Sequence, residues 1–399
     1  MTHILKVGVL GTDKNTIHKF ENLYKHKNIS LHFIEPWPDK KSLIDKEVII
    51  VTMEWSPKWR ITIDLCKKLK IPTYYLVDGV IDWDYLWNNW SYIKGTGTAL
   101  LPLLSDRIGV VSTNQARLLS SLGLSDKIDI VGIPRLDNYD SARSSNVKNT
   151  ILITTANTPF LNNYSEVYVK RALSDLKDYF KLNKSYKVLW KIDKELSKLI
   201  DVKNSLENIN EILGQVCATI SFPSTVVLES MIKELPTAII DYRNVPSLIN
   251  TAWKISNEKD IGPVVQDLLA PNEEFNVYQS HCLSDNISYG NATNRLVYNL
   301  FKLTKKEDLL SKLNLNINCK CEYLNIPNLN THITSFKINS IHVVQYYLDA
   351  YRKEAYHLKN IINYIIYLVR PQKKSFFITK MIKSRKIIKE INKFIKENL

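Results

Sequence analysis

The sequence has few cysteines and no long apolar run. Five of the 399 residues are Cys, and Cys319 and Cys321 stand too close together to form a CxxC pair, with no His at zinc-finger spacing from them. The odd number and wide scatter of the cysteines favour a reduced environment over a disulfide framework. The sequence therefore predicts neither a metal site nor a cofactor.

Apolar stretches are too short to cross a membrane. The longest, residues 361–369, falls well short of the roughly 18 residues that a spanning helix needs. Residues 1–10 pass directly into a strand-like pattern, without the apolar core and small-residue cleavage site of a signal peptide. These absences predict a cytoplasmic protein.

Glycine is scarce, with 11 residues, and the sequence has no complete dinucleotide fingerprint. Gly8 and Gly11 accompany the first expected strand, but the third glycine of the motif is missing and no phosphate-binding helix follows at the right spacing. We interpret the two glycines as the first turn, facing a cleft.

Positive charge is concentrated near the C-terminus. Residues 351–399 contain 13 Lys or Arg against three Glu, a balance of +10, whereas the whole chain carries +14. Helices are expected over 341–368 and 378–397, and the second has an apolar stripe beside its basic residues. Such a helix is typical of contact with an anionic membrane, here through residues 371–399. Packing on the protein and binding to nucleic acid or an acidic partner are the alternatives.

Short β-branched runs alternate with helical patterns along the first 139 residues. Strands are expected over 4–10, 30–34, 48–52, 73–77, 107–112 and 128–131, and helices over 58–69 and 114–122, with Gly123 as a stop signal. Strands separated by helix-length segments predict a parallel, doubly wound sheet.

A second series of the same kind follows the polar, Ser-rich run 140–149. Strands are expected over 150–154, 187–191, 218–221 and 237–241, and helices over 165–180, 206–213 and 225–232. The predicted fold is α/β, with two Rossmann-like domains facing a cleft and a basic helical extension. The predicted divisions are a first domain at 1–139, a linker at 140–149, a second domain at 150–305 and the extension at 306–399. Ligands of such sheets usually bind in the cleft.

The most informative segment, residues 219–241, reads TISFPSTVVLESMIKELPTAIID. Ser224 and Thr225 begin a helix directly after a strand, where unpaired N–H groups and the positive end of the helix dipole favour an anion. Glu229 lies one turn further along the same helix face, where a carboxylate can accept hydrogen bonds from a ribose. A helix cap followed by a solvated acid is the plainer interpretation.

This segment resembles the donor site of GT-B glycosyltransferases, especially bacterial capsule and cell-surface polysaccharide transferases, including relatives of the glycerophosphate and Kdo transferases. The resemblance implies that Ser224 and Thr225 bind the donor phosphates and that Glu229 meets the ribose. Sugar-nucleotide 2-epimerases have a similar helix, so the resemblance is shared between two activities.

Other stretches of residues 1–300 agree with the resemblance. VGIPRLD at 131–137 is similar to the family's entry to the linker, and residues 280–295 are similar to its closing segment. TTANTP at 154–159 matches the position where such enzymes line the donor pocket, which implies donor contacts for Thr155 and Asn157.

The end of the second domain's middle strand departs from the family pattern. Relatives often have Lys-x-His-Pro there, whereas this chain reads Lys191, Ile192, Asp193 and Lys194. Lys191 can still offer a cation to a phosphate. A surface charge at a strand end is the alternative.

An inverting transferase needs a general base near the cleft. Asp78 follows the strand at 73–77 and precedes Gly79, which makes it our first choice, and Glu54 follows the strand at 48–52 and is the second. Five tryptophans nearby are candidates for stacking on sugar rings, with core packing as the alternative. They are Trp55, Trp59, Trp83, Trp87 and Trp90.

The sequence predicts a glycosyltransferase that moves a sugar, or a related polyol phosphate, from a nucleotide-activated donor to a surface polysaccharide or a lipid-linked glycan. It is expected in the cytoplasm, at the inner face of the cell membrane, with no nucleic-acid partner. A sugar-nucleotide epimerase of the same fold is the first alternative. A basic nucleic-acid-binding protein is the second, although no RNA or DNA motif accompanies the charge.

Overall fold

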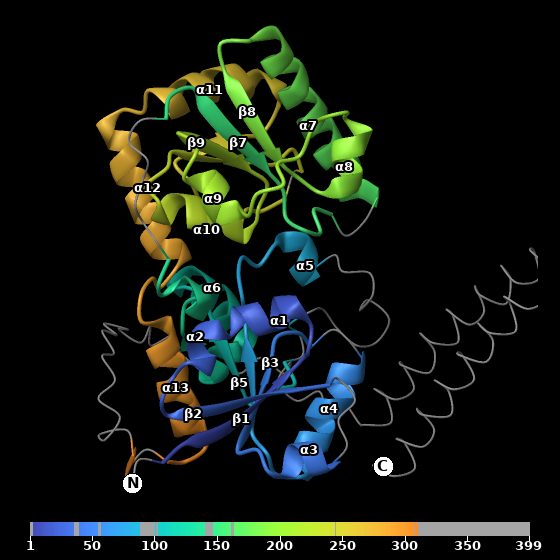
Figure 1. Ribbon diagram of the computed structural model, residues 1–399, viewed down its shortest axis with the longest axis vertical. Coiled ribbons are helices and arrows are strands. Elements are labelled where there is room, and N and C mark those ends of the chain that lie inside the picture. The colour runs from blue at the N-terminus through green and yellow to red at the C-terminus, as the bar shows by residue number, and fades with distance from the viewer. Residues whose placement is uncertain are drawn as a thin grey trace, which may run out of the picture.

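The computed structural model describes residues 3–35, 40–54, 57–87, 100, 103–139, 147–160, 163–243, 245–306 and 308–309. Predictions for other residues, including the basic helices and the membrane-binding segment 371–399, lie outside the described residues. Figure 1 shows two α/β domains, one above the other, with the first domain in blue to teal and the second in green to gold.

The first domain is built on a six-stranded parallel sheet with the order β2-β1-β3-β4-β5-β6. Its strands are β1 (Leu5–Leu10), β2 (Ile29–Ile34), β3 (Val48–Val51), β4 (Thr73–Leu76), β5 (Arg107–Val110) and β6 (Ile128–Ile130). Its helices are α1 (Lys14–Lys19), α2 (Glu21–Tyr24), α3 (Lys40–Ile44), α4 (Pro57–Lys68), α5 (Trp83–Trp87) and α6 (Thr113–Leu119). Both central strands, β3 and β4, are buried throughout, as expected for parallel strands covered on both faces.

The second domain is built on a five-stranded parallel sheet with the order β11-β10-β9-β7-β8. Its strands are β7 (Thr150–Thr154), β8 (Lys187–Lys191), β9 (Ala218–Ser221), β10 (Thr237–Ile240) and β11 (Trp253–Ile255). Its helices are α7 (Asn163–Leu182), α8 (Lys194–Leu199), α9 (Ile209–Leu213), α10 (Thr225–Ile232) and α11 (Ile261–Leu269).

The predicted α/β fold of two doubly wound domains is confirmed. The bounds of β7, β8, β9 and α10 are those predicted, and the other predicted strands end within two residues of the observed ones. Gly123 has a φ of 83°, the left-handed conformation that stops a helix. The sequence patterns did not reveal β11, which has only three residues.

The predicted division of the chain is wrong at the end of the second domain. The chain returns through α12 (Glu273–Asn286) to α13 (Ala292–Leu303), whose apolar side chains pack with β1 and β2 in the first domain. Both carboxylate oxygens of Asp137 accept hydrogen bonds at the start of α13, from the N–H groups of Ala292 (2.7 Å) and Thr293 (2.6 Å). The apolar face of α13 therefore completes the core of the first domain, beside the amino-terminal strands (Figure 1).

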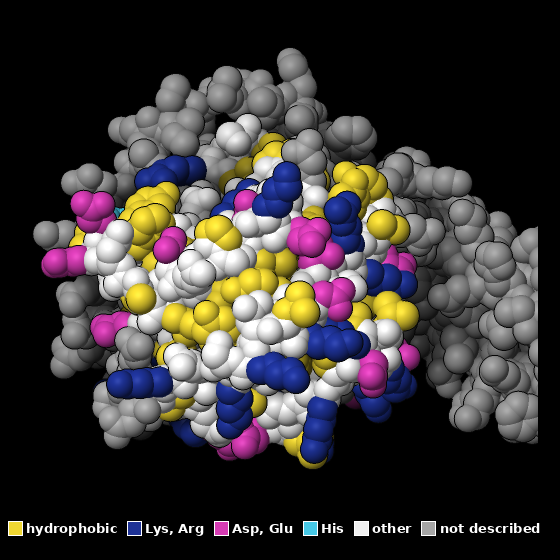
Figure 2. Space-filling model, turned by 90° about the horizontal axis from the view of Figure 1, so that it is seen from above, with side chains coloured by type: hydrophobic (Ala, Val, Ile, Leu, Met, Phe, Trp, Pro, Cys, Tyr) yellow, Lys and Arg dark blue, Asp and Glu magenta, His cyan; other side chains and the backbone are white. Residues whose placement is uncertain are grey.

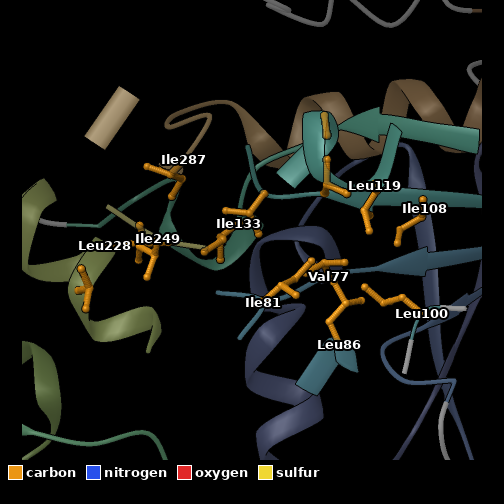
Figure 3. Close-up of a cluster of buried hydrophobic side chains, with 14 of the residues drawn as sticks. Val77, Ile81, Leu86, Leu100, Ile108, Leu119, Ile133, Leu228, Ile249 and Ile287 are labelled. Carbon is orange, nitrogen blue, oxygen red and sulfur yellow. The ribbon is translucent and has the colours of Figure 1, made fainter. Parts of the chain in front are cut away.

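One apolar cluster joins the two domains. Val77, Ile81 and Leu86 of the first domain belong to the same buried cluster as Leu228 of α10 and Ile249 of the second domain. Figure 3 shows these side chains, which come from helices and loops of the two domains. The interface is thus a continuous hydrophobic core, which restricts relative domain motion more than a polar contact would.

Charged side chains on the upper face of the second domain are dispersed. Figure 2 shows Lys and Arg interspersed with acidic and apolar side chains on this face. Within the ranges that the structure describes, no helix is both long enough and apolar enough to cross a membrane.

Removing part of the apolar face of α13 should destabilise the first domain. Leu300 is 0% exposed, so Leu300→Ala should lower the free energy of unfolding by about 2–5 kcal/mol. Leu182→Ala, at a leucine that is 83% exposed, is the matched control and should change it by less than about 0.5 kcal/mol. Urea denaturation measures both. If Leu300→Ala lowered the free energy of unfolding no more than Leu182→Ala does, α13 would contribute nothing to the core.

Candidate active site between the domains

A cavity of about 810 Å³ lies where the carboxyl ends of the two sheets face each other. Its wall is formed by α1, by the loops after β4, β7 and β8, and by the start of α10. Parallel strands place these loops at one edge of each sheet, which explains the position of the cavity. Of the residues predicted for catalysis and for donor binding, all except Glu54 line it.

Ser224 does not act as a helix cap, although it occupies the N-cap position of α10. Its side chain makes no capping hydrogen bond, and its hydroxyl lies 3.0 Å from that of Ser221. By contrast, Ser112 at the start of α6 accepts a hydrogen bond from the Gln115 N–H. The side chain of Ser224 therefore caps none of the first-turn amides of α10. The Val227 N–H donates to the Ser224 carbonyl oxygen at 3.2 Å, and the N–H groups before it are in a position suited to an anion.

Thr225 meets the first domain at Gly79. Gly79 has a φ of 140°, and a side chain there would collide with the Thr225 hydroxyl. Glycine is therefore required at this position, because only it permits both the backbone conformation and the close approach. This contact brings the loop after β4 against the start of α10.

Glu229 is almost fully buried in the cavity wall. Its Oε1 accepts a hydrogen bond from Nη1 of Arg135 at 2.8 Å, and its Oε2 has no hydrogen-bond partner among the described residues. Burial raises the pKa of the Glu229 carboxyl, and the positive charge of Arg135 opposes this effect. A buried carboxylate oxygen without a partner favours a ligand that donates a hydrogen bond to it.

Arg135 joins Glu229 to Asp78 across the domain boundary. It belongs to the short helical turn Pro134–Leu136, after the last strand of the first domain, and its Nε lies 3.5 Å from Oδ1 of Asp78. Burial works against the charged guanidinium, but the two carboxylates raise the pKa of Arg135. The sequence patterns did not predict a role for Arg135 in the site, although a cation just after the carboxyl end of a strand could have indicated one.

Asp78 lies between two cations. Oδ2 of Asp78 lies 3.1 Å from Nζ of Lys19 on α1, in addition to the contact with Arg135. The neighbouring His18 also lines the cavity, and its side chain is largely exposed. The sequence patterns did not point to His18 or Lys19, because α1 has only six residues.

Thr155 and Lys191 organise the second-domain side of the cavity. The Thr155 hydroxyl accepts a hydrogen bond from the Asp193 N–H at 2.9 Å. The Lys191 ammonium donates to the carbonyl oxygens of Ser205 (3.1 Å) and Glu207 (2.7 Å), so it holds this loop as well as lining the cavity. Asn157 lines the cavity and is exposed.

Glu54 lies outside the cavity, which corrects the placement expected from its strand end. It is fully buried, and its two carboxylate oxygens accept hydrogen bonds from the N–H groups of Leu104 (2.7 Å) and Ser105 (2.9 Å). Burial raises the pKa of this carboxyl, and the backbone hydrogen bonds act against the shift. The geometry indicates that Glu54 anchors the loop at 104–105.

The tryptophans do not form a sugar-binding surface in the described part of the cavity wall. Trp59, on α4, is buried in the apolar core, and Trp83 is not among the residues that line the cavity. Trp55, Trp90 and the side chain of Trp87 lie outside the described residues. For Trp59, core packing was the correct alternative.

Across the residues that the structure describes, no three His, Cys, Asp or Glu side chains are grouped so that they could hold a metal ion. Positive charge in the cavity wall is provided instead by side chains such as Lys19 and Arg135.

Comparison with known proteins identifies the fold. No protein-family model and no curated protein sequence matches the chain. The structure of S. aureus MnaA with UDP is similar, with a TM-score of 0.53 at 11% identity over 77% of this chain and 98% of that chain. So is the Methanocaldococcus jannaschii UDP-GlcNAc 2-epimerase in complex with UDP-GlcNAc and UDP, with a TM-score of 0.53 at 14% identity over 75% of this chain and 100% of that chain.

The wall teichoic acid polymerase TagF soaked with CDPG has a TM-score of 0.50 at 12% identity, over 77% of this chain and 90% of that chain. These structures belong to the GT-B class, so the chain has the GT-B fold, and the predicted resemblance is confirmed at the level of fold.

The anchoring role of Glu54 can be tested by Glu54→Gln. Gln replaces one carboxylate oxygen with an NH₂ group, which cannot accept a hydrogen bond from a backbone N–H group. The free energy of unfolding should therefore fall by about 1–3 kcal/mol while nucleotide binding is retained. Glu21→Gln, at an exposed position, is the matched control and should have little effect. Urea denaturation and calorimetry measure these quantities. Loss of turnover at unchanged stability would restore a catalytic role for Glu54.

Proposed function

We propose that the protein is an enzyme that transfers a sugar, or a related polyol phosphate, from a nucleotide-activated donor to a glycan acceptor. The observation that carries the proposal is the start of α10, where Ser224 leaves the helix uncapped in the cavity wall. The nucleotide ligands of the structures with the same fold support a nucleotide-activated donor.

The geometry of α10 suits the phosphates and the ribose of a nucleotide. The helix start offers unpaired N–H groups and two hydroxyls to a diphosphate, and Glu229 offers its Oε2 to a ribose hydroxyl. Glu229 lies four positions beyond Thr225, a rise of about 6 Å along the helix, which is comparable to the distance between a nucleotide's phosphate and its ribose hydroxyls.

In the transfer step, the acceptor hydroxyl attacks the anomeric carbon and loses its proton to a base in the first domain. The bond between that carbon and the donor phosphate breaks, and its electron pair leaves with the nucleoside diphosphate. With a polyol phosphate donor the hydroxyl instead attacks the phosphorus that carries the polyol, the phosphoanhydride bond breaks, and its electron pair leaves with the nucleoside monophosphate. Lys19 and Arg135 contribute positive charge near this group.

We consider two side chains of the first-domain wall as the base that accepts the proton. Asp78 is our first choice, because Lys19 and Arg135 hold its carboxylate in the wall below the donor site. His18 is exposed to the cavity and is the second. For the acceptor itself we propose a surface polysaccharide or lipid-linked glycan, reached when residues 371–399, rich in Lys and Arg, bind an anionic cytoplasmic membrane face.

The donor site is tested by combining Ser224→Ala with Thr225→Ala. Each lost charge-assisted hydrogen bond is worth about 1.5–3 kcal/mol, so affinity for UDP or CDP should fall at least about tenfold, with little change in stability. Ser112→Ala is the matched control, because that serine does cap its helix: it should lower stability by about 1 kcal/mol and leave nucleotide affinity unchanged. Unchanged affinity in the double variant would exclude this site.

The base is tested by comparing Asp78→Asn with His18→Gln. Asp78→Asn should reduce turnover by about 100-fold or more while nucleotide affinity is retained, and His18→Gln should have a small effect. Turnover is measured as release of nucleoside diphosphate from sugar donors, or of nucleoside monophosphate from polyol phosphate donors, with and without membranes as a source of acceptor glycan. If His18→Gln reduced turnover more than Asp78→Asn does, His18 would be the base. An altered sugar nucleotide formed without acceptor would favour the epimerase instead.

A further inference from the structure

An arginine beside the cavity is surrounded by carboxylates from both domains. Arg243 follows β10 in the second domain, and Asp241 lies two residues before it. Asp82 and Asp84 belong to the loop after β4 and to α5 in the first domain. Arg243 and the two first-domain aspartates all line the cavity.

The guanidinium of Arg243 uses all five of its N–H donors in this cluster. Its Nε and Nη2 donate to the two oxygens of Asp241, both at 2.9 Å. Its Nη1 and Nη2 donate to the two oxygens of Asp82, at 3.0 and 2.7 Å, and Nη1 also donates to Oδ2 of Asp84 at 2.8 Å. Three of the five hydrogen bonds therefore cross between the domains.

The cluster is withdrawn from water. The side chain of Arg243 is 6% exposed, that of Asp84 is 2% exposed and that of Asp82 is 25% exposed. The hydroxyl of Ser165, at the start of α7 in the second domain, also donates to Asp84. A buried ion pair of this kind gains little net energy over the hydrated charges, but it is satisfied in only one geometry. What the cluster determines is therefore the orientation of one domain on the other.

The apolar cluster at the domain boundary and the Arg243 cluster complement each other. Apolar contacts are not directional, so the hydrophobic interface alone permits small rotations of one domain on the other. A second, directional attachment between the loops after β4 and β10 removes that freedom. The contact between Arg135 and Glu229 depends on the same relative position, because the two residues come from different domains.

We propose that Arg243 is a positioning residue that holds the two domains closed before a nucleotide binds. The cavity is then preformed, and binding energy is not consumed in closing it. This inference rests on the proposed function only for its effect on nucleotide affinity, since closure itself is a property of the free protein.

Small-angle scattering of the full chain without nucleotide tests the inference directly. In Arg243→Met the second domain should rotate on the apolar cluster away from the first, so the cleft should widen and the radius of gyration should rise, and saturating UDP or CDP should reverse the rise. If the closed form falls to about a tenth of the population, affinity for UDP or CDP falls about tenfold. Arg107→Met is the matched control, because the ion pair of Arg107 with Asp129 lies within the first domain. It should change neither scattering nor affinity.

A second variant separates domain positioning from folding. The combination of Asp82→Asn and Asp84→Asn removes the charges on the first domain and leaves Arg243 paired with Asp241, so it should open the cleft without a buried unpaired charge. Wild-type scattering in this variant overturns the inference, even if Arg243→Met is too unstable to study. A lower melting temperature with unchanged scattering also overturns it. If the wild type binds neither UDP nor CDP, the proposed function is wrong. The scattering of the variants would still show whether Arg243 holds the domains closed.

Discussion

The apolar cluster shared by the two domains is the constraint on which the site depends. Through Leu228, α10 contributes to this cluster, while the start of the same helix lies in the cavity wall. Because the buried face of the helix sets its position, the amides and hydroxyls of its first turn are held toward the opposite domain. Packing and ligand binding are therefore properties of one eight-residue element.

Charges of opposite sign alternate across the cleft. Lys19 contacts Asp78, Asp78 contacts Arg135, and Arg135 contacts Glu229, so the row runs from α1 to α10. A phosphate that enters competes with the two carboxylates for the same cations. In this arrangement each charge is paired, so a ligand that matches it offers both an anion for the cations and a hydrogen-bond donor for Glu229.

Local patterns predicted the strands and α10 well, because alternation, helix period and turn residues depend on neighbours in sequence. They could not predict the ion pair of Arg135 with Glu229, which joins segments 94 residues apart. Asp78 and Glu54 both follow strands, and only tertiary packing decides that Asp78 faces the cavity while Glu54 turns toward the 104–105 loop. Similarly, the apolar period of α13 is the same whichever domain it covers, so the sequence pattern assigned it to the wrong one.

The return of α13 to the first domain also bears on the order in which the protein is completed. The ribosome delivers β1 early, but the first domain lacks part of its core until Leu296, Leu300 and Phe301 have been synthesised. The second domain, by contrast, has its sheet within residues 150–255. During synthesis, the first domain is thus made first but completed only when α13, near the end of the described chain, has been made. Until then its apolar strands are exposed, and they are the part of the nascent chain that most needs protection from aggregation.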